Sequence, residues 1–134
     1  MATLQALLLA DFAQVRGNLL YVVSGGIDLL RRPQLPAQTD FSLAGSLLLE
    51  PTEVGVAHEL RLKLASEGQV ILQAVIGVQY DLDGHEPPGY CPVLNFAVPI
   101  HVAVDHYGVY DVIAIVNDEE QRRVSFHVVE PPAD

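Results

Sequence analysis

The sequence has one cysteine, one lysine, no tryptophan and no apolar run long enough to cross a membrane. A lone cysteine cannot pair within its own chain, which excludes a disulfide scaffold, and a transmembrane helix needs roughly 18–20 consecutive apolar residues. Only seven of the 134 residues are Lys or Arg, against 17 Asp and Glu, so the formal net charge is −10. A surface this acidic repels nucleic acid and anionic membranes, and we expect neither as a partner.

Half of the residues are apolar, and the length is that of one domain. A chain of this size buries roughly 68% of its unfolded surface without metals or disulfides, so we expect a single domain over residues 1–134. A secretory signal needs a basic start and an uninterrupted apolar stretch. The run Leu7–Leu9 has neither, because the first basic residue is Arg16 and Asp11 interrupts the run. The sequence therefore predicts a cytoplasmic protein.

Beta-branched residues are abundant, since valine and isoleucine together supply 24 residues. They pack well on pleated surfaces and lose side-chain freedom in helices, which favours strands. Apolar residues then recur at every second position, the period of a half-buried strand. The strands predicted in this way are residues 41–49, 56–64, 70–80, 94–104, 110–116 and 123–129. The polar stretch 117–121 is expected to join the last two as a hairpin.

The N-terminal segment allows two interpretations. Thr3 to Gly17 has a helical apolar stripe, an N-cap residue and a glycine stop. Alternatively, a strand from Leu4 to Val15 turns into a second strand from Leu19 to Ser24. We favour the hairpin, because residues 19–23 have the composition of a strand and a hairpin gives both runs a partner.

With this hairpin, about eight strands follow one another at intervals typical of sandwiches. Tyr110 enters the penultimate strand two residues after Gly108, as in the tyrosine corner of immunoglobulin-like domains, where the hydroxyl bonds backbone upstream. A half-buried strand tyrosine is the alternative. Val112 stands where antibody domains have a disulfide cysteine. The sequence therefore predicts an all-β, immunoglobulin-like β-sandwich of about eight mostly antiparallel strands.

Three short motifs carry a resemblance to a known family. They are Ala10-Asp11-Phe12-Ala13-Gln14-Val15, Leu20-Tyr21-Val22-Val23-Ser24-Gly25-Gly26-Ile27-Asp28, and Arg32-Pro33-Gln34-Leu35-Pro36. With the closing strands, the chain resembles a family of small bacterial proteins of unknown function, over nearly its whole length. In that family an acidic-aromatic-alanine signature opens the chain. The resemblance implies a compact, cytoplasmic, sandwich-like domain, and it brings no activity, cofactor or catalytic residue.

The loop Asp81-Leu82-Asp83-Gly84-His85-Glu86 has the composition of a calcium loop. An EF-hand places its glycine sixth and is followed by a helix. Here the glycine is fourth and two prolines follow, so we expect a solvated turn. A calcium site completed by Asp118 or Glu119 is the alternative.

The histidines and the cysteine do not predict a metal site. Structural zinc sites have ligands paired two to five residues apart, and only His101 and His106 come close, on opposite faces of a strand. His58 points inward among leucines, where we expect a neutral ring bonded to a backbone carbonyl. The alternative is a ligand pocket at the end of the sandwich, lined by His58, Tyr80 and Tyr90.

The sequence also lacks the pattern of a nucleophilic enzyme. It has no Gly-x-Ser-x-Gly elbow, and Cys91 lies in a proline-rich loop. Asp105 and His106 are adjacent, which in a strand would send their side chains to opposite sides. We therefore predict no catalytic residue, no cofactor and no metal.

Four apolar residues occupy the outward positions of predicted strands. They are Ile71, Val75, Ile113 and Ile115. A strand that is apolar on both faces is covered by another element or by another molecule. We predict that these residues form an interface, in a homodimer or with another protein, and the alternative is that the N-terminal hairpin or a loop covers them. The predicted function is a non-catalytic interaction or structural module, with a small-molecule-binding sandwich as the alternative.

Overall fold

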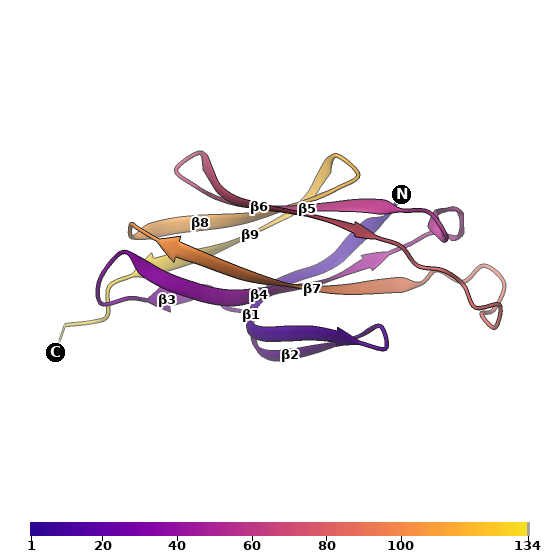
Figure 1. The fold of residues 1–134 in the computed structure, drawn as a ribbon, viewed down its shortest axis with the longest axis horizontal. Coiled ribbons are helices and arrows are strands. Elements are labelled where there is room, and N and C mark those ends of the chain that lie inside the picture. The colour runs from indigo at the N-terminus through magenta and orange to yellow at the C-terminus, as the bar shows by residue number, and fades with distance from the viewer. Residues whose placement is uncertain (134) are drawn as a thin grey trace.

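A computed structural model describes residues 1–133, which form nine strands in two sheets packed face to face (Figure 1). The elements in chain order are β1 (Thr3–Arg16), β2 (Leu19–Gly25), β3 (Leu29–Arg31), β4 (Ala37–Leu48), the single-turn 3-10 helix η1 (Pro51–Glu53), β5 (His58–Ser66), β6 (Gln69–Val78), β7 (Val93–Val104), β8 (Gly108–Val116) and β9 (Glu119–Val129). Within this part of the chain, no helix has the length and apolarity needed to span a membrane.

The strands pair in the orders β2-β1-β4-β7 and β3-β9-β8-β5-β6. All pairs are antiparallel except β3 with β9. The prediction of an all-β sandwich is therefore confirmed. The additional strand is β3, whose three residues are too few for an alternating pattern to appear in the sequence.

The core lies between the two sheets and is built from their inward residues. Tyr110 stacks on Phe126 with 5.4 Å between ring centroids, and Phe41 meets Phe126 edge-on at 5.6 Å. These rings come from β4, β8 and β9, so they join the two sheets. Aromatic pairs in these geometries are favourable beyond the area that they bury.

The N-terminal segment forms the predicted hairpin, and the hairpin forms an additional layer. The first half of β1 pairs with β4 as far as Ala10, and the second half pairs with β2. The chain bends between the halves, so the hairpin lies over the outer face of the four-stranded sheet (Figure 1). At its tip, the Asn18 side chain donates to the Val93 carbonyl at 2.8 Å and accepts from the Asn95 N–H at 3.1 Å. Ala44, on the outer face of β4, is fully buried in consequence.

The turn between β8 and β9 is tighter than predicted. Only Asn117 and Asp118 form it, both with positive φ, and β9 begins at Glu119 instead of Arg123. Two consecutive residues with positive φ are typical of a two-residue hairpin turn, and Asn and Asp adopt this conformation more readily than most residues. The polar residues 119–121 therefore belong to the strand.

The predicted contact of Tyr110 is present. Its ring is fully buried, and its hydroxyl donates to the carbonyl of His106, four residues upstream, at 2.8 Å. Burial raises the pKa of this phenol above its ordinary value, although the bond to His106 opposes the shift. The bond connects the start of β8 to the turn that precedes it.

Candidate functional site

Three of the four residues predicted as an interface, Ile113, Ile115 and Val75, lie on the outer face of the five-stranded sheet. Ile113 and Ile115 belong to β8 and Val75 to the edge strand β6, whereas Ile71 of β6 lies at a β-bulge and lines a polar hollow beside Ser66. β5, which lies between β8 and β6, separates the two isoleucines from Val75, because Arg61 lies between Ile115 and Val75 in the register. The face is therefore apolar on two strands, with basic side chains on the strand between them.

The charges on this outer face nearly balance. It carries four basic and three acidic side chains: Arg31, Arg61, Lys63, Arg123, Glu59, Asp111 and Glu120. Arg61 donates to Glu59 at 2.8 Å and Arg123 to Glu120 at 3.0 Å. Because the chain has a net charge of −10, all of the excess negative charge lies on the rest of the molecule.

This outer face is open among the described residues. Val75 is 54% exposed, and the N-terminal hairpin, which was one predicted cover, lies on the opposite sheet. The hairpin instead covers small residues such as Ala44 and Ser42 on β4. The sandwich therefore has one covered sheet and one sheet whose outer side faces solvent.

The hairpin presents a second apolar surface, which the sequence analysis did not identify. On its outer side lie Phe12, Leu19, Tyr21 and Val23, with exposed fractions between 49% and 62%. Phe12 pairs directly with Val23 across the two strands. The signal in the sequence was the run 19–23, which is apolar at every position and therefore on both faces of its strand. We call these four residues the hairpin surface.

A polar hollow of about 210 Å³ lies between the turn after β5 and the turn after β7. In it, the Ser66 hydroxyl lies 2.8 Å from Nε2 of His106, and Nδ1 of His106 lies 2.7 Å from an Asp105 carboxylate oxygen. The prediction that Asp105 and His106 point apart is wrong, because both lie in the turn between β7 and β8 and not in a strand. The sequence could not pair Ser66 with His106, which are 40 residues apart.

Ser66, His106 and Asp105 contact one another in the sequence of a serine–histidine–aspartate triad, but the carboxylate is exposed and the hydroxyl is buried. A triad holds its carboxylate buried so that it orients the histidine. Here the Asp105 side chain is 76% exposed, whereas Ser66 is buried and its hydroxyl also contacts the Val109 carbonyl at 2.8 Å. The arrangement thus ties the end of β5 to the start of β8.

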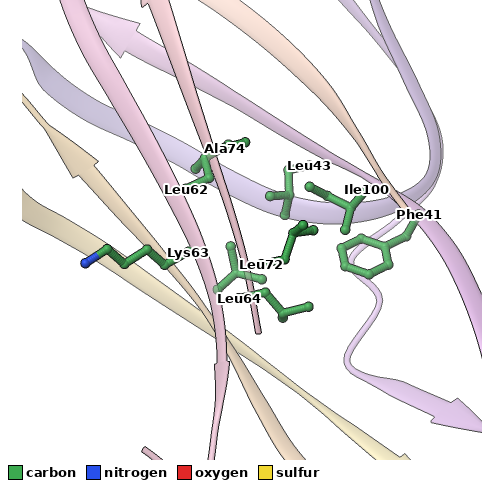
Figure 2. Close-up of a pocket in the computed structure, with 9 residues that line it drawn as sticks. Phe41, Leu43, Leu62, Lys63, Leu64, Leu72, Ala74 and Ile100 are labelled. Carbon is green, nitrogen blue, oxygen red and sulfur yellow. The ribbon is translucent and has the colours of Figure 1, made fainter. Parts of the chain in front are cut away.

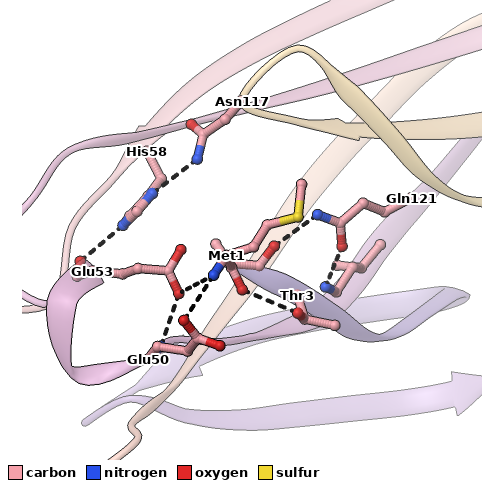
Figure 3. A network of polar contacts seen from close by, with 9 residues as sticks. Met1, Thr3, Glu50, Glu53, His58, Asn117 and Gln121 are labelled. Carbon is pink, nitrogen blue, oxygen red and sulfur yellow. Dashed lines mark hydrogen bonds and ion pairs between the residues drawn. The ribbon is translucent and has the colours of Figure 1, made fainter.

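His58 lies in a polar network at the other end of the sandwich (Figure 3). Its buried ring donates from Nε2 to the Glu53 carbonyl at 2.9 Å and accepts at Nδ1 from the Asn117 amide at 3.0 Å. The Asn117 side-chain oxygen accepts from the backbone N–H of Glu59, which fixes the orientation of the amide. Both ring nitrogens of His58 therefore have a hydrogen-bond partner, and the predicted bond to a backbone carbonyl is present.

The same network holds the start of β1. The Met1 ammonium lies 2.9 Å from Glu50 and 3.3 Å from Glu53, and the hydrogen bond to Glu50 raises its pKa. Burial opposes the ionisation of Glu53, but the Glu50 N–H and the ammonium outweigh burial and lower its pKa. Gln121 of β9 accepts from the Leu4 N–H at 2.6 Å and donates to the Ala2 carbonyl at 2.7 Å (Figure 3).

In the loop 81–86, which the sequence suggested as a calcium site, the carboxylates of Asp83 and Glu86 accept hydrogen bonds from the backbone of the loop itself. Asp83 accepts from the His85 N–H at 2.8 Å, which lowers its pKa. Glu86 accepts from the N–H groups of Asp83 and Gly84 at 2.9 and 3.2 Å. Residues 1–133 contain no group of three His, Cys, Asp or Glu side chains placed to hold a metal ion. Cys91 is an exposed free thiol.

An apolar gap opens between the sheets near Leu72 of β6 and Ile100 of β7 (Figure 2). Its volume is about 10 Å³, which is the space of roughly one water molecule. Ligand pockets are far larger, about 300–1,000 Å³. The residues predicted to line a pocket, His58, Tyr80 and Tyr90, are not among those that line this gap. His58 lies in the polar network above. Burial raises the pKa of Tyr80, and the neighbouring Tyr90 raises it further.

Comparison with known proteins places the chain in a family. No curated protein matches it. Among solved structures, two of a β-glucosidase from Listeria innocua are similar, one with bound glucose and one without. Each matches at a TM-score of 0.48 and 6% sequence identity, and the match covers 98% of this chain but 17% of the β-glucosidase. The model of a family of unknown function, DUF6941, matches residues 5–129. The chain therefore belongs to this family of unknown function.

Proposed function

We propose that the protein is a non-catalytic interaction module that self-associates through the outer face of its five-stranded sheet. The observation that carries the proposal is the near balance of charge on this open face, while the excess of acidic side chains, which gives the chain its net charge of −10, lies on the rest of the molecule. Two copies repel each other least where they approach through a neutral surface.

The composition of the face also fits a contact between identical surfaces. A two-fold axis brings each patch against its own copy, so the basic side chains of β5 can meet the acidic side chains of the partner. Ile113 and Ile115 would supply the apolar centre, together with Val75 at the edge. Interfaces of this kind combine an apolar centre with a polar rim.

An immunoglobulin-like relationship forms part of the proposal. It is supported by the strand order, in which β9-β8-β5-β6 faces β1-β4-β7, and by the bond from Tyr110 to the carbonyl of His106. Domains with this architecture commonly act in recognition, so the analogy favours binding over catalysis. The exposed thiol of Cys91 fits a reducing, cytoplasmic compartment. The Asp11-Phe12-Ala13 signature as a mark of the family stays a prediction.

Self-association is tested by sedimentation equilibrium of the full chain. We expect a mass of twice the 14.6 kDa chain at micromolar concentration. Replacing Ile113→Glu should shift the equilibrium to the monomer, because it places a like charge at the centre of the contact. Val56→Glu, which alters a residue 50% exposed on the loop before β5, is the matched control. A monomer in the unaltered chain would refute the proposed self-association.

The non-catalytic part is tested separately. Because the Ser66 hydroxyl is buried and bonded to a carbonyl, we expect no reaction with a fluorophosphonate probe over hours at neutral pH. Labelling of Ser66, abolished by His106→Ala, would identify a nucleophile and contradict this part of the proposal.

A further inference from the structure

We propose that the free edge of β2 binds an extended segment of another protein, which adds to the sheet as a further strand and carries basic residues at one end. The inference rests on the interaction role proposed above, but it uses a different surface. β2 is the outermost strand of the four-stranded sheet, and its hairpin carries the exposed residues of the hairpin surface, Phe12, Leu19, Tyr21 and Val23.

Over residues 19–23, the edge of β2 lacks the features that prevent strand addition. Proteins usually protect edge strands with charge, proline, a bulge or very short length. β7 contains Pro99, which has no N–H to offer, and β3 has only three residues and ends at Arg31. β2 has seven residues, Leu19–Gly25, without charge or proline, and its extended part is residues 19–23, because Ser24 has a positive φ of 53°. β6 is also uncharged, but it borders the face assigned above to a second copy.

An added strand would extend the hairpin surface. In the register, Phe12 pairs with Val23, and Gln14 with Tyr21, so these side chains share one face. Alternate residues of an incoming strand would lie beside Tyr21 and Val23, which are 49% and 56% exposed. Backbone hydrogen bonds would supply affinity, and apolar residues at every second position would supply specificity.

Charge selects the occupant. After the end of β2, Gly26 and Ile27 both donate their N–H groups to the Leu9 carbonyl, at 2.8 and 3.1 Å, so the chain that leads to Asp28 stays beside β1 two residues from Asp11. Both aspartates are exposed. The hairpin therefore ends beside two carboxylates, within the part of the molecule that bears the net charge of −10. A second copy would bring the same acidic end, whereas a segment with Lys or Arg beside Gly25 is attracted.

The test uses the full chain and labelled synthetic peptides in which Thr and Val alternate, with either two lysines or two glutamates at one end. Fluorescence anisotropy at low salt should show that the lysine peptide binds more tightly than the glutamate peptide by about threefold to tenfold. Replacing both Asp11→Asn and Asp28→Asn should remove this preference. Amide NMR shifts should concentrate in residues 19–25.

Val23→Lys introduces the charge that native edge strands use, and should weaken binding of the lysine peptide by about tenfold or more. Val56→Lys, which alters a residue 50% exposed on the loop before β5 and outside both proposed surfaces, is the matched control and should leave peptide binding unchanged. Circular dichroism and thermal unfolding verify that both variants are folded. No binding of either peptide, equal binding to Val23→Lys, or NMR shifts centred on β6 would overturn the inference.

The two proposals fail separately. Loss of the dimer in Ile113→Glu with peptide binding retained supports two distinct surfaces. A monomeric chain that still binds the lysine peptide refutes only the self-association proposed above. If Val23→Lys abolishes the dimer while Ile113→Glu does not, the occupant of β2 is a second copy, and the inference of another protein is wrong.

Discussion

Gly45 shows how one residue fixes the distance between the strands of the core. It lies on the inward side of β4, where the Phe96 ring of β7 packs against it. A Cβ at this position would contact the ring and would come within 2.6 Å of the Ala6 carbonyl oxygen. Backbone cannot yield to such a contact as a flexible side chain can, so β1, β4 and β7 approach this closely because residue 45 has no side chain.

We expect Gly45→Ala to lower the free energy of unfolding by about 1–3 kcal/mol, the usual cost of overpacking. Gly77→Ala in β6 is the matched control, because a Cβ there has nothing within 4 Å; its effect should be neutral or stabilising by up to ~1 kcal/mol. Urea unfolding of both variants measures the difference. Equal effects would show that the close approach does not govern stability.

The buried hydroxyl of Tyr110 makes the stability of the protein depend on pH. Because burial raises the pKa of Tyr110, its contribution to stability is present below the ordinary phenol pKa of about 10 and is lost as the pH rises through the folded value. Tyr110→Phe keeps the ring and removes the bond to His106, so we expect a loss of about 0.5–1.5 kcal/mol at neutral pH. This deficit should shrink above about pH 10.

Urea unfolding between neutral pH and pH 11 measures this dependence, with Tyr21→Phe on the exposed hairpin surface as the control. The control should follow the unaltered chain at every pH. If Tyr110→Phe runs parallel to the unaltered chain up to pH 11, the phenol is not the titrating group.

At the scale of elements, Asn18 attaches the hairpin to the sheet that it covers. Its side chain bonds Val93 and Asn95 of β7, and its backbone carbonyl accepts from the Asn95 amide at 2.7 Å. Asn18→Ala removes the side-chain bonds. We expect amide hydrogen exchange to accelerate across residues 12–25, since local opening of a poorly packed element needs less free energy than global unfolding.

Exchange in β8 should stay unchanged in Asn18→Ala, because that strand lies in the other sheet. Gln14→Ala, which alters an exposed residue of the same hairpin, is the control, because it leaves the hydrogen bonds of Asn18 at the tip intact. Uniform acceleration throughout the chain would show instead that the hairpin and the sandwich unfold together.

The elements also show what alternation in a sequence can and cannot predict. Long half-buried strands such as β5 and β8 were predicted because every second residue meets the core. The bend of β1 at Ala10 was not predicted. It depends on Ala44 and Ser42, which are small enough for a hairpin to cover them. The contact of Ser66 with His106 depends on two turns meeting in space, which no local pattern encodes.

At the scale of the whole molecule, charge and apolar surface are distributed unequally between the two sides. The five-stranded sheet has an open outer face with nearly balanced charge, and the four-stranded sheet is covered by a hairpin whose own outer side is apolar. The excess of acidic residues lies away from the first face. This separation permits a dimer that leaves both hairpins accessible, because the two surfaces are on opposite sheets (Figure 1).

The net charge makes a final prediction about salt. Two copies of charge −10 repel one another at long range, and salt screens this repulsion over a Debye length of about 10 Å at 0.1 M. Salt weakens short ion pairs between the two copies less than it weakens this long-range repulsion, because such pairs are partly desolvated. We therefore expect sedimentation equilibrium to show tighter self-association as salt rises from about 0.05 to 0.5 M. Binding of the lysine peptide to β2 should weaken over the same range, since that contact joins opposite charges. If both interactions respond to salt in the same direction, they do not use surfaces of different charge.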